Sequence, residues 1–350
     1  MYYPKDDPFL ADTLIDTVRF SIPAKDTVQN YIFKQKADVA GSGVTYVFNV
    51  WSTLATDGNF GNDSLFNYEA TNFTKQPGYI ENFESQTEFI DGSCLNPFQD
   101  FIGQGWSVGN TNFNWNLQNA RTCLGPNGAT ATLGTGPAGD HPTGEGKFFY
   151  TESSLTGGVA TLVSPCIYFT NSTGAAAAFW YHMFGNQMSN LYIDVLADGV
   201  WNLTVDSIIG QRQLSIDENW RLKGVNLGNF AGKMIQVRFR AVQRGTVGDI
   251  AIDDIEFFEP IPQDARVTEV MTPITECSPG GTVKIALENF GLDTILGGKI
   301  VVKFRANNGA IFSDTIARGI GVGDSIHHTF TSQGSFNRLN TLYTLLAWTE

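Results

Sequence analysis

Four acidic side chains, in three separate parts of the chain, are of a type that binds hard cations. Glu84 follows an Asn-Phe pair, Asp140 lies in a stretch rich in Gly and Pro, and Asp253 and Asp254 end an apolar run. Calcium takes several carboxylate and carbonyl oxygens from turns and strand ends. The same carboxylates can instead accept backbone hydrogen bonds in turns. Asp253 and Asp254 are adjacent on a predicted strand and face opposite ways, so we expect at most one to bind an ion unless a bulge intervenes.

No other group of side chains is typical of an active site. The four histidines, His141, His182, His327 and His328, form no His-Glu-x-x-His motif, and the chain has no Gly-x-Ser-x-Gly sequence. His141 is next to Asp140, but a structural role suits adjacent residues better than a catalytic pair. The carboxylate pair of a glycosidase leaves no local motif to recognise. We therefore predict that the chain is not an enzyme.

Two tryptophans are candidates for stacking on the face of a sugar ring. Trp201 and Trp220 are flanked by Gly, Asn, Glu and Arg, which suggests exposure, whereas Trp180 lies in an apolar run typical of a core. Packing in the core or at a sheet edge is the alternative for both candidates, and we favour it.

The elements that position these residues are predicted to be strands. The chain has 350 residues, 42% of them hydrophobic and only 16% charged, with 37 Gly and 26 Phe. Disordered chains are charge-rich and aromatic-poor, so we expect two or three folded, all-β domains with Gly-rich turns. The net charge of −13 disfavours nucleic acid as a partner, and no stretch is apolar enough for membrane insertion.

The two ends of the chain resemble each other. Near the N-terminus, Asp16, Asp26, Tyr46 and Trp51 are separated by 10, 20 and 5 residues. Near the C-terminus, intervals of 10, 19 and 5 residues separate Asp314, Asp324, Tyr343 and Trp348. The offset of 298 residues between Asp16 and Asp314 indicates slightly more than one period of a long tandem array.

Strand-like segments around this repeat predict immunoglobulin-like sandwiches. They cover residues 45–51 and 64–68 near the N-terminus, and 283–287 and 300–304 near the C-terminus. Residues 283–291 resemble the start of bacterial immunoglobulin-like adhesion modules. We expect residues 1–78 to hold the closing strands of one unit and residues 261–350 to lack the last strand of another. Successive copies of the repeat would then complete each other.

Residues 79–260 resemble the MAM family along their whole length. Six family marks occur in order: Asn82-Phe83-Glu84, Trp106 with Trp115, and residues 136–150, 162–166, 179–185 and 249–255. The resemblance implies a jelly-roll sandwich of two antiparallel sheets. It also implies that the first strand, the Gly-rich loop and the last strand meet at one edge. There Glu84, Asp140 and either Asp253 or Asp254 would hold a structural calcium ion.

Two departures from the family limit what the resemblance implies about disulfides. Animal members usually carry a cysteine just before the Phe-Glu pair, where this chain has Glu81-Asn82, and Pro142 interrupts the family's Asp-His-Thr run. Their disulfide pattern is therefore not carried over. Cys94 and Cys123 flank one aromatic-rich loop, and we predict a disulfide between them; the partners of Cys166 and Cys277 stay open.

A tripeptide of Asp, Ser or Thr, and an apolar residue occurs eight times, seven of them outside the central module. It resembles the O-glycosylation acceptor of one large group of bacteria with surface-adhesin arrays. The predicted acceptors are Thr13, Thr17, Thr27, Ser64, Ser207, Thr294, Thr315 and Ser325. The alternative is that Asp-Thr is simply a common pair at the start of strands.

These features together predict a non-catalytic, extracellular adhesion or structural segment of a repetitive cell-surface or fibre-forming protein. We expect neighbouring repeats as partners, with surface glycans or proteins as candidate ligands. A carbohydrate-binding module and an accessory region of a secreted hydrolase are the alternatives. The N-terminus lacks the apolar core of a signal peptide, so we expect a mature product or an interior piece of a longer chain.

Overall fold

The computed structural model describes residues 1–17, 33–35, 37–39, 44–54, 64–86, 105–109, 113–119, 134–154, 158–170, 174–272, 281–334, 336 and 343–350. They form two compact units, unit 1 (Met1–Lys75) and unit 2 (Gln76–Glu350). Helical structure in these ranges consists of two short 3-10 turns, η1 (Pro8–Leu10) and η3 (Gly228–Phe230). Cys94, Cys123, Cys277 and Thr27 lie outside the described residues, so the predicted disulfide stays a prediction.

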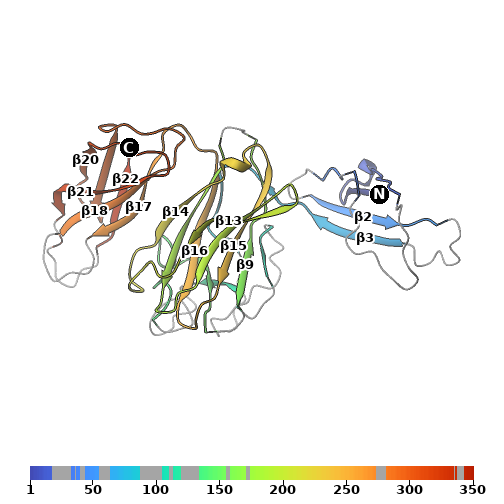
Figure 1. Cartoon of the computed structure of the whole chain (residues 1–350), viewed down its shortest axis with the longest axis horizontal. Coiled ribbons are helices and arrows are strands. Elements are labelled where there is room, and N and C mark those ends of the chain that lie inside the picture. The colour runs from blue at the N-terminus through green and yellow to red at the C-terminus, as the bar shows by residue number, and fades with distance from the viewer. Residues whose placement is uncertain are drawn as a thin grey trace. The chain divides into compact units, whose positions relative to one another are not determined.

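Unit 1 contains a small antiparallel sheet with the strand order β1-β2-β3 (Figure 1). Its strands are β1 (Tyr2–Pro4), β2 (Thr45–Trp51) and β3 (Ser64–Thr71), and the two-residue β4 (Thr74–Lys75) follows. Tyr46 and Val47 are buried, and the rings of Tyr2 and Phe48 stack at 6.0 Å. The bounds of β2 are those expected from the sequence.

Unit 2 begins with the central sandwich, which is built from two antiparallel sheets, as the predicted jelly roll requires (Figure 1). The first sheet follows the order β13-β12-β15-β10, with β9 paired to β15 and β6 to β9. Its strands are β6 (Ser107–Val108), β9 (Val159–Val163), β10 (Cys166–Tyr168), β12 (Asn190–Ala197), β13 (Val200–Ile208) and β15 (Met234–Val242).

The second sheet of the central sandwich has the order β14-β11-β16-β8-β7, with β5 paired to β16. Its strands are β5 (Tyr79–Glu81), β7 (Trp115–Asn119), β8 (Lys147–Thr151), β11 (Ala176–Phe184), β14 (Arg221–Asn226) and β16 (Asp249–Phe258). The alanine run that opens β11 could have been read as helix. It forms a strand because aromatic residues continue it into the buried sheet.

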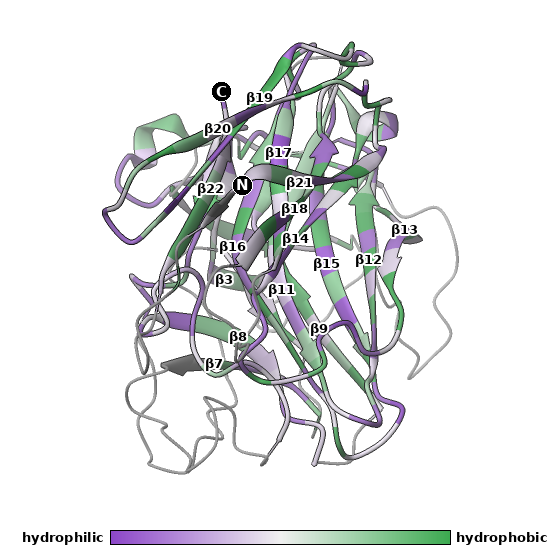
Figure 2. Cartoon of the chain, turned by 90° about the vertical axis from the view of Figure 1, so that its left-hand side faces the viewer, coloured by the Kyte–Doolittle hydropathy of each residue, from purple (hydrophilic) through white to green (hydrophobic). Residues whose placement is uncertain are grey.

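The core of the central sandwich follows from the period of two along its strands. In β15 every second residue is buried, and Figure 2 shows the same alternation of apolar and polar residues along this strand. Trp106 and Trp115 are fully buried between the sheets, and the indole N–H of Trp115 donates to the backbone carbonyl of Phe239 at 3.2 Å. That bond satisfies the one polar atom of a large buried ring.

The C-terminal sandwich also consists of two antiparallel sheets, with the orders β17-β18-β21 and β20-β19-β22. Its strands are β17 (Ala265–Thr272), β18 (Gly281–Asn289), β19 (Ile300–Ala306), β20 (Phe312–Ile316), β21 (Ser325–Gly334) and β22 (Leu345–Thr349). Val283, Ile285, Val302 and Phe304 lie in the core between the two sheets. The predicted strands at residues 283–287 and 300–304 lie within β18 and β19.

The connection between the two sandwiches of unit 2 is packed. Arg266 on β17 pairs with Glu256 on β16 at 2.6 Å and with Asp264 at 2.9 Å. Its guanidinium carbon lies 4.2 Å from the ring centre of Phe258 and 5.0 Å from that of Phe290. Both charge pairing and cation–π attraction therefore hold Arg266 between strands of the two sandwiches.

Candidate functional site

Glu84 and Asp140 come together around Gly146, at the edge where the Gly-rich loop enters β8. A Cβ atom at Gly146 would lie 2.1 Å from Glu84 Oε1 and 2.6 Å from Asp140 Oδ2. The absence of a side chain at this position is therefore what allows both carboxylates to approach. Lys147 donates its backbone N–H to Glu84 Oε1 at 2.7 Å, which fixes one of these oxygens.

Asp253 approaches the same loop from β16. Its side chain is fully buried, and its Oδ2 accepts the backbone N–H of His141 at 3.3 Å. Burial raises the pKa of Asp253 well above its usual range, and the neighbouring carboxyl groups of Asp140 and Asp254 raise it further. Asp140 Oδ1 is also buried and accepts no hydrogen bond. A buried oxygen without a donor is costly, and either a proton on the neighbouring Asp253 carboxyl or a cation would compensate it.

Asp254 pairs with the side chain of His141, and β16 is bulged at this position. The register between β11 and β16 shifts between Ala178 and Trp180, and Asp254 has a φ of +43°. Asp254 Oδ2 lies 2.7 Å from Nδ1 of His141, whose ring stacks on Trp180 at 4.0 Å. Of the two adjacent aspartates, Asp253 faces Asp140 and Asp254 pairs with His141.

Within the described ranges, no three His, Cys, Asp or Glu side chains surround one point closely enough to hold a metal ion by themselves. Glu84, Asp140 and Asp253 nevertheless lie at one loop edge, with one buried oxygen that has no donor. Calcium usually takes six to eight oxygens, including backbone carbonyls and water, so three carboxylates form only part of a complete shell.

A second charged group, formed by Asp194, Arg238 and Arg240, lies on the outer face of the first sheet and was not predicted from the sequence. Asp194 is fully buried, and its carboxylate accepts hydrogen bonds from Arg238 and Arg240 at 2.7–3.0 Å. Arg238 lies over Trp201 at 4.0 Å and Arg240 over Tyr192 at 4.6 Å. Alternation along β12 and β15 signals that the arginines face outward, but no local pattern shows that both reach one carboxylate.

The electrostatics of Asp194 are dominated by these donors. Burial alone would raise the pKa of this carboxyl, but hydrogen bonds from Arg240, from the amide of Thr204 and from Arg238 outweigh it and lower the pKa below its usual value. Asp194 is therefore ionised in the folded protein, and the network is a buried ion triad that ties β12 to β15.

The two tryptophans proposed to stack on sugars are placed differently. Trp220 is 8% exposed, packs against Phe148 at 5.7 Å, and donates its indole N–H to the carbonyl of Gly139 at 3.1 Å. Its ring has no open face for a ligand, which agrees with the packing alternative. Trp201 is half-buried with Arg238 over its ring, so the stacking role stays a prediction for Trp201 alone.

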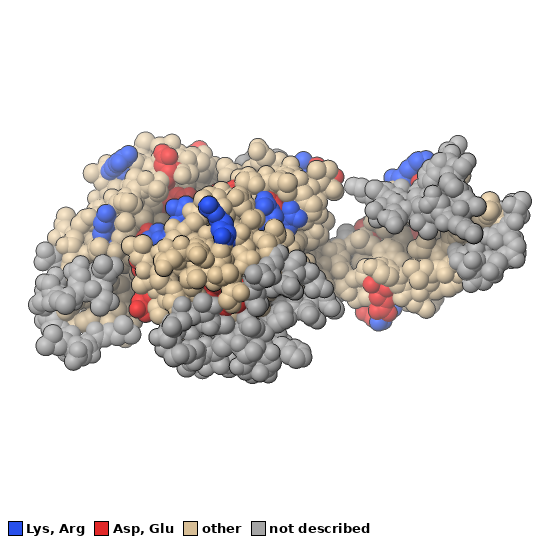
Figure 3. Space-filling model, turned by 60° about the horizontal axis from the view of Figure 1, so that its bottom comes forward, with Lys and Arg blue, Asp and Glu red and all other residues tan. Residues whose placement is uncertain are grey.

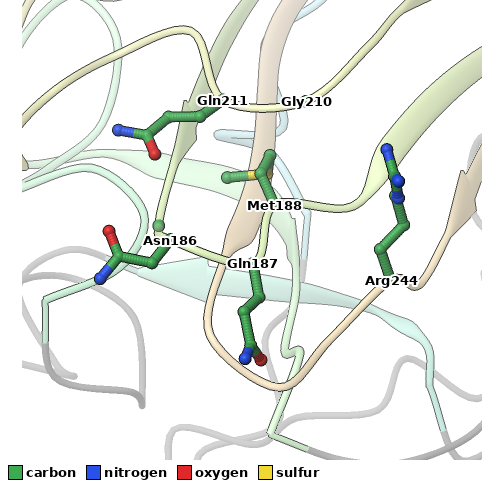
Figure 4. Close-up of a pocket in the computed structure, with 7 residues that line it drawn as sticks. Asn186, Gln187, Met188, Gly210, Gln211 and Arg244 are labelled. Atoms are coloured by element: carbon green, nitrogen blue, oxygen red, sulfur yellow. The ribbon is translucent and has the colours of Figure 1, made fainter.

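A shallow pocket of about 420 Å³ lies among loops at the ends of β11, β13 and β15 (Figure 4). It is lined by Gly185, Asn186, Gln187, Met188, Gly210, Gln211 and Arg244. Figure 4 shows Arg244 and Gln211 on opposite sides of Met188. This lining offers amide and guanidinium groups to a ligand, and it contains no carboxylate, imidazole or thiol that could act as a base or nucleophile.

Most of the predicted glycosylation acceptors that the structure describes lie at the surface. Ser207 is half-buried, and the exposed acceptors are Thr13, Thr17, Ser64, Thr294, Thr315 and Ser325. Three of the aspartates that precede them accept the backbone N–H of the next residue at 2.6–2.8 Å. That local bond is also what an ordinary Asp-Thr turn makes, so the glycosylation itself stays a prediction.

The fold and the loop edge define a two-sheet antiparallel sandwich of the jelly-roll class. The sequence model of the MAM domain (meprin/A5/mu) matches residues 98–261, so this segment is similar to the MAM family. The match begins later than the resemblance seen from residue 79, because that resemblance included Asn82-Phe83-Glu84.

Vertebrate neuropilins are related to this region. The chain is 31% identical to neuropilin-1a of Danio rerio over 195 residues, which cover 49% of this chain and 19% of the relative. It is 32% identical to neuropilin-1 of Rattus norvegicus over 163 residues, or 43% of this chain and 17% of the relative. The chain thus spans less than a fifth of these relatives. MAM domains and neuropilins are extracellular.

Two solved structures are similar at a lower level. The K1 cleaved adhesin domain of Lys-gingipain from Porphyromonas gingivalis W83 covers 52% of this chain and 97% of its own, with 17% identity and a TM-score of 0.31. TmCBM61 in complex with β-1,4-galactotriose covers 51% and 99%, with 13% identity and a TM-score of 0.31. Neither score is high enough to establish a common fold over the whole chain.

Proposed function

We propose that this chain is a non-catalytic adhesion and spacer segment of a repetitive cell-surface or fibre-forming protein. The MAM domain supports an extracellular interaction module, and the related ends of the chain support a tandem array. Figure 3 presents a face that is mostly neither acidic nor basic, with Lys and Arg at several separate places and Asp and Glu among them. Such a surface suits packing and protein or glycan contacts better than binding to nucleic acid. No described helix has the length and apolar character needed to cross a bilayer.

The observation that carries the spacer role is the packed joint in unit 2. Three backbone hydrogen bonds connect the loop after β18 to the linker between the sandwiches. The N–H groups of Phe290, Leu292 and Asp293 donate to the carbonyls of Asp264 at 2.7 Å, Ile261 at 3.1 Å and Pro262 at 2.7 Å, respectively. A linker bonded in this way cannot swing without breaking its bonds. A stiff pair of sandwiches keeps distant parts of a long protein apart, as a spacer must.

Calcium is part of the proposal. Glu84, Asp140 and Asp253 would hold it, and it would neutralise a group of acidic side chains that otherwise repel one another. The ion would join β16 and the loop before β8 to the segment after β5, which are far apart in the sequence. Its role would be structural.

Single-molecule pulling between the two ends of the full chain tests this function. A spacer should unfold in discrete steps, with unit 2 resisting as one step in calcium and at lower force in chelator. Extension at the low force of an unstructured chain would contradict the proposal. Saturable binding to a glycan array that Trp201→Ala abolishes would favour the carbohydrate-binding alternative instead.

A further inference from the structure

The strand β22 lies at the end of its sheet in the C-terminal sandwich. The sheet order is β20-β19-β22, and among the described residues no strand forms a backbone ladder with the other side of β22. β17 of the facing sheet contacts β22 near its end, where the Thr349 hydroxyl donates to the carbonyl of Ala265 at 2.7 Å. Leu346 on this strand is 48% exposed, while Leu345 and Ala347 pack partly against the core. An apolar strand with one unpaired side is a template for another strand.

In unit 1, the strand equivalent to β22 is β2, which has a neighbouring strand on each side. The matched pairs Tyr46 with Trp51 and Tyr343 with Trp348 make β2 the counterpart of β22. β2 lies between β1 and β3 in the order β1-β2-β3. Phe48 of β2 and Leu345 of β22 are equivalent positions. Phe48 opposes Tyr2 of β1, and Leu345 opposes Ala306 of β19, so β1 occupies beside β2 the position that β19 occupies beside β22.

The backbone hydrogen bonds agree with this equivalence. In the C-terminal sandwich, the N–H of Asn307 donates to the carbonyl of Thr344 at 2.7 Å, and the N–H of Glu350 donates to that of Val301 at 2.9 Å. Antiparallel strands alternate the direction of their bonds, so Leu345, Ala347 and Thr349 turn their backbone groups to the unpaired side.

The same alternation holds in unit 1. The N–H of Asn49 donates to the carbonyl of Met1 at 2.9 Å, and the N–H of Lys5 donates to that of Thr45 at 2.7 Å. Phe48 and Val50 therefore turn their backbone groups toward β3, where they oppose Tyr68 and Leu65. Their counterparts in β22 are Leu345 and Ala347, which face the unpaired side.

We propose that the unpaired side of β22 is an acceptor site for one more antiparallel strand. Its occupant is a second copy of the strand Ser64–Thr71, supplied by the adjoining repeat, so this inference rests on the proposed array. The register follows from unit 1. Leu345 opposes the copied Tyr68, Ala347 the copied Leu65, and Trp348 the copied Ser64.

The test extends the full chain after Glu350 with a copy of its own residues 54–75. The copied strand then follows Trp348 at the same sequence separation at which Ser64–Thr71 follows Trp51. Hydrogen exchange at the amides of Leu345, Ala347 and Thr349 should slow by at least about tenfold. The melting temperature of the C-terminal sandwich should rise by about 5 °C or more. The matched control carries the same 22 added residues in scrambled order.

Engineered cysteines check the register independently. In unit 1 the Trp51–Ser64 pair makes no direct backbone bonds, and such pairs bring side chains closest. Trp348→Cys with Ser64→Cys in the added copy should therefore form a disulfide, whereas Ala347→Cys with the same partner should not, because its side chain faces the other side of the sheet.

Two results would overturn the proposal: exchange and melting equal to those of the scrambled extension, or cross-linking that does not distinguish the two cysteine positions. Either leaves the pulling behaviour of the unextended chain as it was. Failure of the acceptor site and failure of the spacer function can therefore be told apart.

Discussion

At the scale of single residues, glycine decides whether the proposed calcium site can form. Gly146→Ala would place a methyl group against Glu84 Oε1 and Asp140 Oδ2. We expect the calcium-dependent rise in melting temperature to disappear and calcium affinity, measured by titration calorimetry, to fall by about tenfold or more. Gly228→Ala is the control, because its added Cβ would meet one oxygen at 3.0 Å, far from these carboxylates.

Asp194 provides a second test, one of stability. Asp194→Ala leaves Arg238 and Arg240 without their shared acceptor, and breaking such a buried ion group costs about 3–5 kcal/mol. Because the two arginines are 18% and 20% exposed, we expect a loss near the lower end, about 3 kcal/mol by urea denaturation. Lys233→Ala removes an exposed ion pair with Asp198 and should change stability by less than about 1 kcal/mol.

His182 makes stability depend on pH. Burial lowers its pKa from 6.5 to about 3, and the backbone of Glu218 offsets this only in part. Below pH 6.5 the unfolded chain binds a proton that the folded chain refuses, so this contribution is complete above pH 6.5 and is lost as the pH falls toward 3.

We expect His182→Phe to reduce the slope of unfolding free energy against pH between 4 and 6 by up to about 1.4 kcal/mol per unit. Denaturant titrations at several pH values measure it. The comparison is His327→Phe, which removes an exposed histidine from β21. Equal slopes in the two variants would contradict the assignment to His182.

At the scale of elements, the contact of β14 and β16 with the loop after β18 couples the two sandwiches. Phe290 packs against Phe258 at 6.3 Å, and Gly224 on β14 leaves room for its ring, since a Cβ there would lie 2.7 Å from it. Phe290→Ala should cost about 3 kcal/mol. It should also split a single calorimetric transition of unit 2 into two.

Phe312→Ala is the matched control for this coupling. Phe312 stacks on Phe304 at 4.9 Å within the C-terminal sandwich. Its loss should destabilise that sandwich without changing the contact with the central one. One transition in Phe290→Ala, or two in Phe312→Ala, would argue against the coupling.

At the scale of the whole molecule, the two sandwiches of unit 2 should resist proteases as one piece. The linker at residues 259–264 is tied to the loop after β18 by backbone hydrogen bonds. We expect limited digestion with a protease of broad specificity to leave a fragment that contains both sandwiches uncut between them. Early cleavage at 259–264, identified by mass spectrometry, would show that this linker opens on its own.

The sequence alone was sufficient for the fold class, for many strands and for the family of the central domain. The predicted strand at residues 45–51 has the bounds of β2, and those at 283–287 and 300–304 lie within β18 and β19. The ordered MAM marks predicted a domain that the family comparison confirms. Glu84, Asp140 and either Asp253 or Asp254 were named from the sequence as calcium ligands, and calcium binding by them stays a prediction.

Only the tertiary structure decided which partners these residues have. At a bulge in β16, Asp253 lies beside Asp140 and Asp254 pairs with the ring of His141. Polar neighbours made Trp220 a candidate for stacking on sugars, with packing as the favoured alternative, and its contacts with Phe148 and Gly139 bury it. The ion triad joins Asp194 to arginines 44 and 46 residues away. Local periodicity encodes which face a side chain lies on; which distant side chain it meets depends on the register and packing of strands that only the folded chain brings together.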